Sequence, residues 1–211
     1  MATNAATSPF TLEGAYVRLE PLCTEHAPVL WEIARNDCRE LFEWVPYRLE
    51  SLEDFQEFNA YVLREQAQGV SIPFATFIRN GGQIAGSTRF MNMDLRNRKV
   101  EIGSTWVAPP WQRTFVNTEA KYLMLRHAFE CWNCLRVEFK TDALNERSRR
   151  AILRLGAKEE GTLRKHLLTW NGRSRDSIYF SILDSEWPEV KRHLEMELAR
   201  HGTDRVNSGA S

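Results

Sequence analysis

A short polar segment between a strand pattern and a helix pattern has the residue types of an anion-binding loop. Pro109 and Pro110 end the strand pattern, and the run from Gln112 to Thr118 leads into the helix. The first N–H groups of a helix lack partners inside it and lie at the positive end of its dipole, so a diphosphate can accept hydrogen bonds there while Arg113 adds charge. An ordinary capped crossover helix would use the same residues, and this alternative stays open. The apolar face of that helix is Ala120, Leu123, Met124 and Ala128.

Asn145 and Ser148 open the next helix pattern. Asn145 is a favourable N-cap, and Ser148 lies on the face of the predicted helix that also carries Ile152 and Leu155. The Ser148 hydroxyl would therefore point inward at the electropositive first turn, where a departing thiolate could accept a hydrogen bond from it. Helix capping alone is the competing explanation of both residues.

Glu101 lies in the strand pattern of residues 100–107 and alternates with apolar residues. Those apolar residues are Val100, Ile102 and Trp106. The Glu101 carboxylate could serve as a general base or relay a proton through water, or it could be a solvated group on an open sheet face. Gly103 in the same strand is consistent with close approach of another group to the backbone.

Turn residues and periodicity predict the elements that must position these side chains. Asn80-Gly81-Gly82 and Asn171-Gly172 each predict a β-hairpin, and strand and helix patterns alternate between the two hairpins. Such a crossover implies a parallel strand pair inside a mixed sheet covered by helices, so the fold class is α/β with antiparallel flanks. The predicted strands are residues 16–20, 74–78, 84–91, 100–107, 136–141, 163–170 and 177–183. The predicted helices are residues 24–39, 51–68, 117–131, 145–155 and 186–200, with Thr24 and Ser51 as caps.

The length of 211 residues and 43% hydrophobic content fit one domain. We expect it to span residues 10–200, between a flexible N-terminus at 1–9 and a flexible C-terminal tail at 201–211. Basic and acidic residues number 28 each, so no overall field attracts nucleic acid or anionic lipid. No segment approaches the roughly 20 apolar residues of a membrane helix, and no secretory pattern opens the chain, so we expect a cytoplasmic protein.

Cys131 and Cys134 have the CxxC spacing of a zinc or redox site. No second CxxC and no paired histidines accompany them, so we expect no metal. Cys131 is expected to pack against the sheet as a small hydrophobic residue.

The segment from residue 136 to residue 164 carries the most specific pattern in the chain. A strand leads into Asn-x-x-Ser at Asn145 and Ser148, then into Leu155-Gly156-Ala157 and Glu160-Gly161-Thr162-Leu163-Arg164. This pattern resembles the GNAT superfamily of N-acetyltransferases, and within it the RimJ/RimL-like group of ribosomal-protein alanine acetyltransferases. The resemblance spans about residues 10–183. It implies the GNAT acyl-CoA N-acyltransferase fold, a mixed and mostly antiparallel sheet whose central parallel strand pair splays to hold CoA, with helices on both faces.

By this resemblance the cofactor is acetyl-CoA, and the polar loop binds its pyrophosphate. Gln112 matches the first position of the family pattern [Q/R]xxGx[G/A], whereas Phe115 and Asn117 stand at the glycine positions. The run from Trp111 to Lys121 is similar to a variant loop of one GNAT subgroup, in which the Asn117 and Thr118 side chains could replace backbone donors. The cofactor-binding residues are then Trp106, Val107, Gln112, Arg113, Thr114, Phe115, Val116, Asn117, Thr118, Asn145 and Ser148.

The resemblance implies acetyl transfer to a primary amine by direct attack, without an acyl-enzyme. Ser148 would donate to the leaving thiolate, Glu101 would be the general base, and a backbone N–H near Trp106 or Val107 would stabilise the oxyanion. Some ribosomal-protein acetyltransferases place a base where this chain has His166, and no carboxylate occupies that stretch. An α-amine has a pKa of about 7.7 to 8.0, against about 10.4 for lysine, so an α-amine acceptor needs little help in losing its proton.

The acceptor would be recognised by variable connections. The residues concerned are Trp44, Tyr47, Arg89 and Trp111, although the aromatic ones could simply cover the edge of the core. The acceptor could be a protein N-terminus, a small-molecule amine, or an antibiotic or toxin that acetylation makes harmless. The altered glycine positions also allow a non-catalytic acetyl-CoA-binding relative. A homodimer could form through the hairpin at Asn171-Gly172 or the last helix, by analogy with relatives that pair.

Overall fold

Eight strands form one mixed sheet in the order β1-β2-β3-β4-β5-β6-β8-β7. The computed structural model describes residues 8–208, and the side chains of residues 8–200. Within the sheet, β5 and β6 run parallel and the other neighbouring strands are antiparallel, which confirms the predicted α/β class. The strands are β1 (Leu12–Glu13), β2 (Val17–Pro21), β3 (Ile72–Ile78), β4 (Ile84–Asp94), β5 (Lys99–Val107), β6 (Arg136–Asp142), β7 (Lys158–Leu168) and β8 (Ser174–Leu183).

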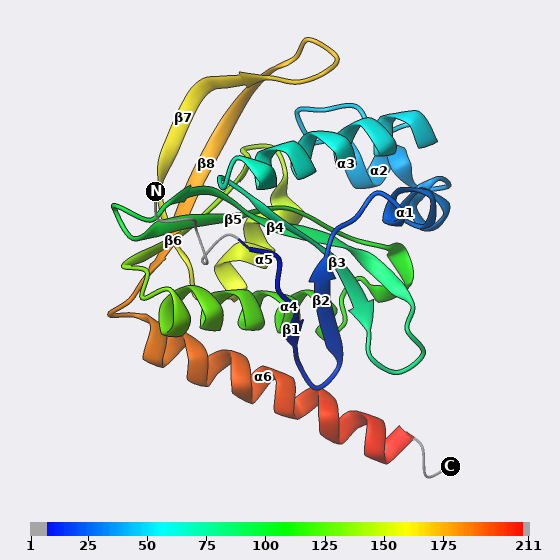
Figure 1. Ribbon diagram of the computed structural model, residues 1–211. Helices are drawn as coiled ribbons and strands as arrows, with labels where there is room; N and C mark the ends of the chain where they lie inside the picture. The colour runs from blue at the N-terminus through cyan, green and yellow to red at the C-terminus, as the bar shows by residue number, and fades with distance from the viewer. Residues whose placement is uncertain (1–7, 209–211) are drawn as a thin grey trace.

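Helices cover both faces of this sheet, and the β7–β8 hairpin projects beyond the other strands (Figure 1). The first three helices pack on one face, here called the α3 face, and the last three pack on the other, here called the α4 face. The helices are α1 (His26–Ala34), α2 (Cys38–Phe42), α3 (Leu52–Ala67), α4 (Phe115–Arg126), α5 (Glu146–Arg154) and α6 (Trp187–Ser208). None of the helices within the described residues is long and apolar enough to cross a membrane.

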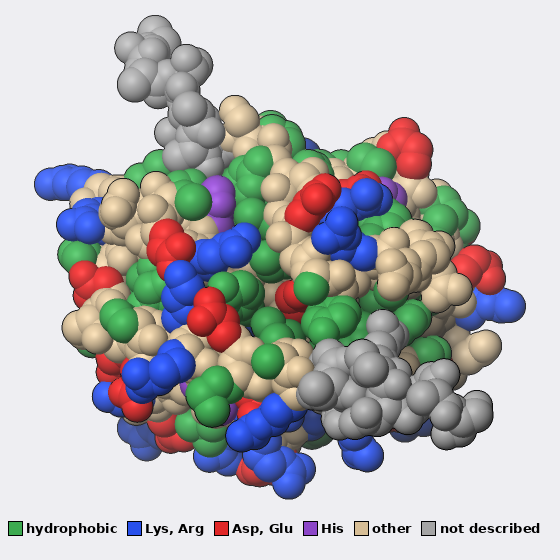
Figure 2. Space-filling model, turned by 90° about the horizontal axis from the view of Figure 1, so that it is seen from below, with side chains coloured by type: hydrophobic (Ala, Val, Ile, Leu, Met, Phe, Trp, Pro, Cys, Tyr) green, Lys and Arg blue, Asp and Glu red, His purple; other side chains and the backbone are tan. Residues whose placement is uncertain are grey.

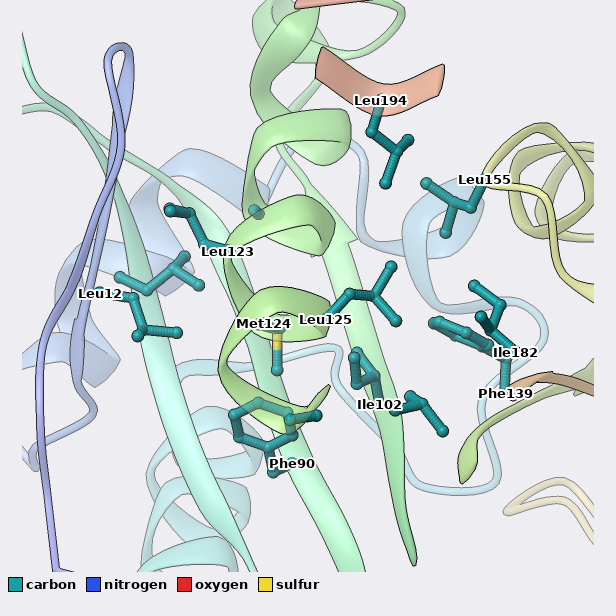
Figure 3. Packing of buried hydrophobic residues seen from close by; sticks show 14 of the residues in the cluster. Leu12, Phe90, Ile102, Leu123, Met124, Leu125, Phe139, Leu155, Ile182 and Leu194 are labelled. Carbon is teal, nitrogen blue, oxygen red and sulfur yellow. The ribbon is translucent and has the colours of Figure 1, made fainter. Parts of the chain in front are cut away.

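The α4 face holds the larger hydrophobic core. Met124 and Leu125 point from α4 toward Phe90 and Ile102 of the sheet (Figure 3), and all four side chains are buried. Removing each such side chain from water stabilises the fold by roughly 1.5–3 kcal/mol. This packing fixes α4 against the strands, and therefore fixes where its N-terminus lies.

The outer surface of this face mixes charges of both signs. Figure 2 views the molecule from the side that α6 covers and shows basic and acidic side chains interspersed there. No large field of one sign marks this face as a binding surface for a polyanion or a polycation.

Ser51 caps α3 as predicted, with a reciprocal capping box. Its hydroxyl accepts a hydrogen bond from the Asp54 N–H at 3.1 Å, and the Asp54 carboxylate accepts one from the Ser51 N–H at 3.0 Å. Thr24 was predicted as the earlier cap, but this is wrong, since α1 begins at His26 after Glu25. The predicted single helix at 24–39 divides into α1 and α2 because the chain leaves helical geometry at Asp37, whose φ is −123°.

The last helix, α6, continues to Ser208, beyond its predicted end near residue 200. Most of the predicted flexible N-terminus, residues 1–7, and the end of the predicted tail, residues 209–211, lie outside the described residues. Cys131 is exposed, so its predicted burial is wrong, and it is Cys134 that packs in the α4-face core.

Candidate active site

The parallel strands β5 and β6 separate after a short stretch of pairing. Their register runs from Lys99 opposite Arg136 to Glu101 opposite Glu138, yet β5 continues to residue 107 and β6 to residue 142. The two strands thus splay apart toward their carboxyl ends. Because α4 follows β5 and α5 follows β6, both helices begin at this edge of the sheet. The polar loop and Ser148, far apart in sequence, therefore flank the same split.

A β-bulge at Ser104 reverses the alternation of β5. The β4–β5 register shifts here, and Ser104 has a φ of 47°. Ile102, before the bulge, lies in the α4-face core, whereas Trp106, after it, packs on the α3 face with its ring 5.4 Å from that of Phe42. The prediction that Trp106 shares a face with Val100 and Ile102 is wrong, because a bulge residue moves all later side chains to the opposite face.

The polar loop is a capped helix start with one left-handed residue. Thr114 caps α4: its hydroxyl donates to the Trp111 carbonyl at 2.7 Å and accepts from the Val116 N–H at 3.3 Å. The left-handed residue is Arg113, with a φ of 59°, and not either of the positions where the family pattern has glycine. Gln112 closes the loop by donating from Nε2 to the Val107 carbonyl at 2.9 Å.

The side chains of this loop differ in what they can offer a ligand. Phe115, Val116 and Thr118 are buried, whereas Arg113 is exposed and Asn117 is half-buried. The guanidinium of Arg113 and the backbone N–H groups of the first turn are thus the groups best placed to meet a diphosphate, with the Val116 N–H already bound by Thr114. Thr118 is buried, and its contact with the cofactor stays a prediction.

Asn145 caps α5, and this leaves the Ser148 hydroxyl available. Asn145 Oδ1 accepts from the Ser148 N–H at 2.9 Å. Ser148 itself is half-buried, and no partner of its hydroxyl is recorded among the described residues. A hydroxyl at the positive end of a helix can donate to a developing anion.

Glu101 is a buried carboxylate with two partners. It is 2% exposed and accepts from Asn92 Nδ2 at 2.7 Å and from Lys140 Nζ at 3.1 Å. The alternative of a solvated carboxylate is therefore wrong. Gly103 permits this arrangement, since a Cβ at its position would lie 2.7 Å from Met91 Sδ and 3.2 Å from Glu101 Oε1.

Polar side chains on β6 and β8 continue the site beyond Glu101. Arg175, Ser177 and Tyr179 alternate along β8 with the buried apolar residues of the α4 face, so they share the α3 face with Glu101. Sequence reasoning missed them, although their period of two was a usable signal. Tyr179 lies beneath Lys140, whose Nζ is 5.9 Å from the ring centroid.

His166 of β7 borders the same polar face. Its ring centroid is 5.7 Å from that of Tyr179, and its Nδ1 is buried without a hydrogen-bond partner among the described residues. Burial, and then the positive charges of Lys140 and Arg175, lower the pKa of His166, which favours the neutral ring at pH 7. The sequence did not predict His166 as a base, because a carboxylate was expected at this place.

Three of the four predicted acceptor residues lie together on the α3 face. The Trp44 carbonyl accepts from Arg175 Nη1 at 3.0 Å, and the Tyr47 ring stacks on Phe58 with centroids 4.3 Å apart. Burial raises the pKa of Tyr47, so its phenol stays protonated. The connection between α2 and α3 is thus fixed to β8 at one end and to α3 at the other.

Arg89 is 4% exposed, pairs with Glu65 and donates from Nε to Ser104 Oγ at 3.1 Å. Its charge is therefore already compensated. Trp111, the fourth predicted acceptor residue, packs against the α4-face core instead, so the structure does not group it with the others.

Lys121 of α4 was not singled out in the sequence. It is 5% exposed, and its Nζ donates to the hydroxyls of Thr88, at 3.1 Å, and Thr105. Burial lowers its pKa to about 7. Its position on the inward face of the helix, in line with Met124 and Ala128, was the signal to look for.

The acetyltransferase (GNAT) domain family matches residues 17–158. The chain therefore belongs to the GNAT acetyltransferase family and is an N-acetyltransferase, as its sequence motifs predicted. Among the described residues, no three His, Cys, Asp or Glu side chains gather as a metal site.

One relative that the chain resembles is named for ribosomal N-acetyltransfer. It is 36% identical over 110 residues to "Putative ribosomal N-acetyltransferase YdaF" of Bacillus subtilis (strain 168), a match that covers 52% of this chain and only 59% of YdaF. A GCN5-related N-acetyltransferase from Brucella melitensis is 31% identical, with 90% of this chain and 85% of that chain covered and a TM-score of 0.83. Mycobacterium smegmatis RimJ, solved in complex with CoA-disulfide, shares the fold at 23% identity, with a TM-score of 0.78 over 90% of this chain and 96% of that one.

Proposed function

We propose that this N-acetyltransferase moves an acetyl group from acetyl-CoA to a primary amine, and that its acceptor is the α-amine of a protein N-terminus. The observation that carries the proposal is the split between β5 and β6, which opens after Glu101 and has the first turns of α4 and α5 on its two sides. Ligands of open α/β sheets bind outside the carboxyl ends of their parallel strands.

The residues of the split fit a long thioester with a diphosphate. Arg113 and the first backbone N–H groups of α4 would hold the diphosphate, and the backbone of β5 beyond the bulge would hold the pantetheine and the acetyl group. The cofactor supplies an activated acetyl group. In this proposal a backbone N–H at Trp106 or Val107 donates to the thioester oxygen, and the Ser148 hydroxyl donates to the sulfur.

The amine approaches from the α3 face, where the buried carboxylate of Glu101 lies. Glu101 is the proposed proton acceptor, with Lys140 and Asn92 holding its carboxylate in place. His166, kept neutral on the same face, is a second candidate for that role. Neither group needs to be a strong base for an α-amine acceptor. The pKa of an α-amine is about 7.7 to 8.0, so a sizeable fraction of the amine is already neutral at pH 7.

Support for a protein acceptor comes from one relative. YdaF, which is 36% identical over 110 residues, is named for ribosomal N-acetyltransfer. The α3 face adds an argument from shape, since the Trp44 to Tyr47 connection and the projecting β7–β8 hairpin border the polar face and could contact a polypeptide chain (Figure 1).

The test is acetyl-CoA consumption with a matched panel of acceptors. Thiol release would be followed with peptides that carry a free N-terminal alanine or serine, the same peptides with a blocked N-terminus, small amines, and an aminoglycoside. We expect turnover that depends on the free α-amine. Turnover with the blocked peptides, or with small amines or the aminoglycoside alone, would contradict the protein N-terminus as acceptor.

A thermal melt with and without CoA completes this test. Stabilisation without turnover across the panel would indicate a non-catalytic acetyl-CoA-binding protein. The absence of both stabilisation by CoA and turnover of acetyl-CoA would overturn the proposal as a whole.

A further inference from the structure

The bulge of β5 is held from both faces of the sheet by buried cations. On the α3 face, Arg89 Nε donates to Ser104 Oγ at 3.1 Å. On the α4 face, Lys121 Nζ donates to Thr105 Oγ1 and, at 3.1 Å, to Thr88 Oγ1. Two consecutive residues of one strand are thus bound by side chains from opposite sides.

The two cations differ in whether a carboxylate lies close enough to pair with them. Arg89 pairs with the Glu65 carboxylate, whereas no carboxylate lies within ion-pair distance of Lys121 Nζ among the described residues. The acidic residue nearest to it in α4, Glu119, turns away and accepts backbone N–H groups of Ala15, Tyr16 and Val17. A buried ammonium without a counter-charge is costly to the fold.

The hydroxyls around Lys121 connect it to the backbone of the bulge. Thr88 Oγ1 and Thr105 Oγ1 are 2.7 Å apart, and Thr105 Oγ1 lies 3.4 Å from the Gly103 carbonyl. A protonated Lys121 donates to both hydroxyls, which leaves the Thr105 hydrogen free to point toward Gly103. A neutral Lys121 can instead accept that hydrogen. The state of the amine thus changes which acceptors are open to the Thr105 hydroxyl, with Thr88 Oγ1 as a further neighbour at 2.7 Å.

We propose that Lys121 is a positioning residue for acetyl transfer, which acts through Thr105 to set the β5 bulge and thereby the backbone N–H groups at Trp106 and Val107. This inference rests on the proposed function for its catalytic consequence, but its structural part concerns the protein alone. Burial, which lowers the pKa of Lys121 to about 7, brings the change of its charge into the working range of pH.

The charged groups around the bulge are limited in number. From the α4 face, Lys121 is the charged side chain of the described residues that contacts the bulge, through the hydroxyls of Thr88 on β4 and Thr105 on β5. From the α3 face, Arg89 with Glu65 faces Ser104, and so does the Tyr47 phenol, whose pKa burial raises. The ion pair of Glu101 and Lys140 lies nearby, between β5 and β6. A titration near neutral pH that Lys121→Met abolishes therefore belongs to Lys121.

The first experiment follows backbone amide signals of the free protein by NMR between pH 5.5 and 9. We expect the amides of Ser104, Thr105 and Trp106 to shift with a common midpoint near neutral pH, and to lose that shift in Lys121→Met and in Thr105→Val. Lys121→Met keeps the length of the side chain and removes a buried charge, so we expect it to fold. Bulge amides that do not titrate, or that titrate equally in Lys121→Met, would overturn the inference.

The second experiment measures steady-state kinetics on the same variants. We expect kcat to fall about tenfold to hundredfold in Lys121→Met and Thr105→Val, with KM values within about threefold, because the contact affects alignment and not binding. Thr88→Val, which removes a hydroxyl but leaves the Lys121 to Thr105 contact, should retain most of the activity. The double variant Lys121→Met with Thr105→Val should be no slower than the worse single variant.

Failure of the proposed function and failure of the inference about Lys121 would give different results. Amides that titrate in a wild-type protein that transfers no acetyl group would contradict the proposed function and leave the Lys121 to bulge coupling standing. Amides that titrate in an active protein whose kcat is unchanged by Lys121→Met would overturn the catalytic part of the inference.

Discussion

Glu101 and Lys140 form an ion pair across the two parallel strands, with Lys140 Nζ 3.1 Å from Glu101 Oε2. Glu101 lies at the last paired position of β5, while Lys140 lies beyond the paired part of β6. The contact therefore bridges the strands where they begin to separate. It places a negative charge at the base of the split and holds it there.

The first prediction separates the chemical role of Glu101 from its structural role. Glu101→Gln keeps the shape and loses the proton acceptor, so we expect kcat to fall about 100-fold with little change in the KM for acetyl-CoA. Lys140→Met keeps the carboxylate but removes its cation, so we expect a smaller loss of kcat and a loss of roughly 1–3 kcal/mol in the free energy of unfolding. Equal losses of kcat in both variants would show that only the ion pair matters.

The second prediction concerns the start of α5, where substitution of one residue should lower kcat and substitution of another should lower stability. Ser148→Ala removes a hydroxyl that has no hydrogen-bond partner among the described residues, so the melting temperature should hardly change while kcat falls about 100-fold. Asn145→Ala removes the cap that the Ser148 N–H binds, so it should lower the free energy of unfolding by about 1 kcal/mol. Asn145→Asp keeps the cap and is the control. A fully active Ser148→Ala would remove this residue from the mechanism.

The third prediction tests the close contact between β4 and β5 beside the bulge. A Cβ on Gly86 would lie 2.1 Å from the Trp106 carbonyl oxygen, and the φ of Gly86 is +151°. Gly86→Ala must move the strand or leave this conformation, and we expect a loss of roughly 3 kcal/mol or more in urea unfolding. Gly82→Ala is the matched control, since Gly82 also has a positive φ, +64°, but has open space around it, and should cost about 1 kcal/mol. Equal costs would mean that the contact with β5 is unimportant.

Local signals in the sequence were enough for most of the fold. The glycine turns predicted both hairpins, and Ser51 and Asn145 were recognised as caps because capping depends on residues a few positions apart. The motif around Asn145 and Ser148 gave the family, which its matched domain confirms. The parallel pair followed from the alternation of strands and helices.

The β5 bulge could not be predicted in this way. Ser104 leaves the regular strand geometry where Arg89 and Lys121, from β4 and α4, bind it and its neighbour. Contacts of this kind are set by tertiary packing, and a period of two read from the sequence cannot anticipate them. The error in the orientation of Trp106 followed from that.

The site was predicted less completely than the fold for a related reason. Glu101 was expected to be either a general base or a solvated carboxylate, and the sequence did not show that it is buried. Its partners Asn92 and Lys140 come from two other parts of the chain. The left-handed conformation of Arg113 was also unexpected, because only its place in the loop, and not its residue type, favours it.

The last prediction concerns the pH dependence of stability that a buried Lys121 must cause. Its pKa is lowered from 10.5 to about 7 in the folded protein, so between these pH values the unfolded chain binds more protons than the folded one. Lys121 therefore makes the protein more stable as pH rises from about 7 toward 10.5, with a slope of at most about 1.4 kcal/mol per pH unit. Urea unfolding of wild type and Lys121→Met at pH 7, 8 and 9 measures this directly, because other titrating groups are common to both proteins and cancel in the difference. We expect the difference in the free energy of unfolding, wild type minus variant, to become more positive from pH 7 to 8 and from pH 8 to 9. Parallel curves would mean that Lys121 keeps an ordinary pKa, and that the amine has found a counter-charge or water in the folded protein.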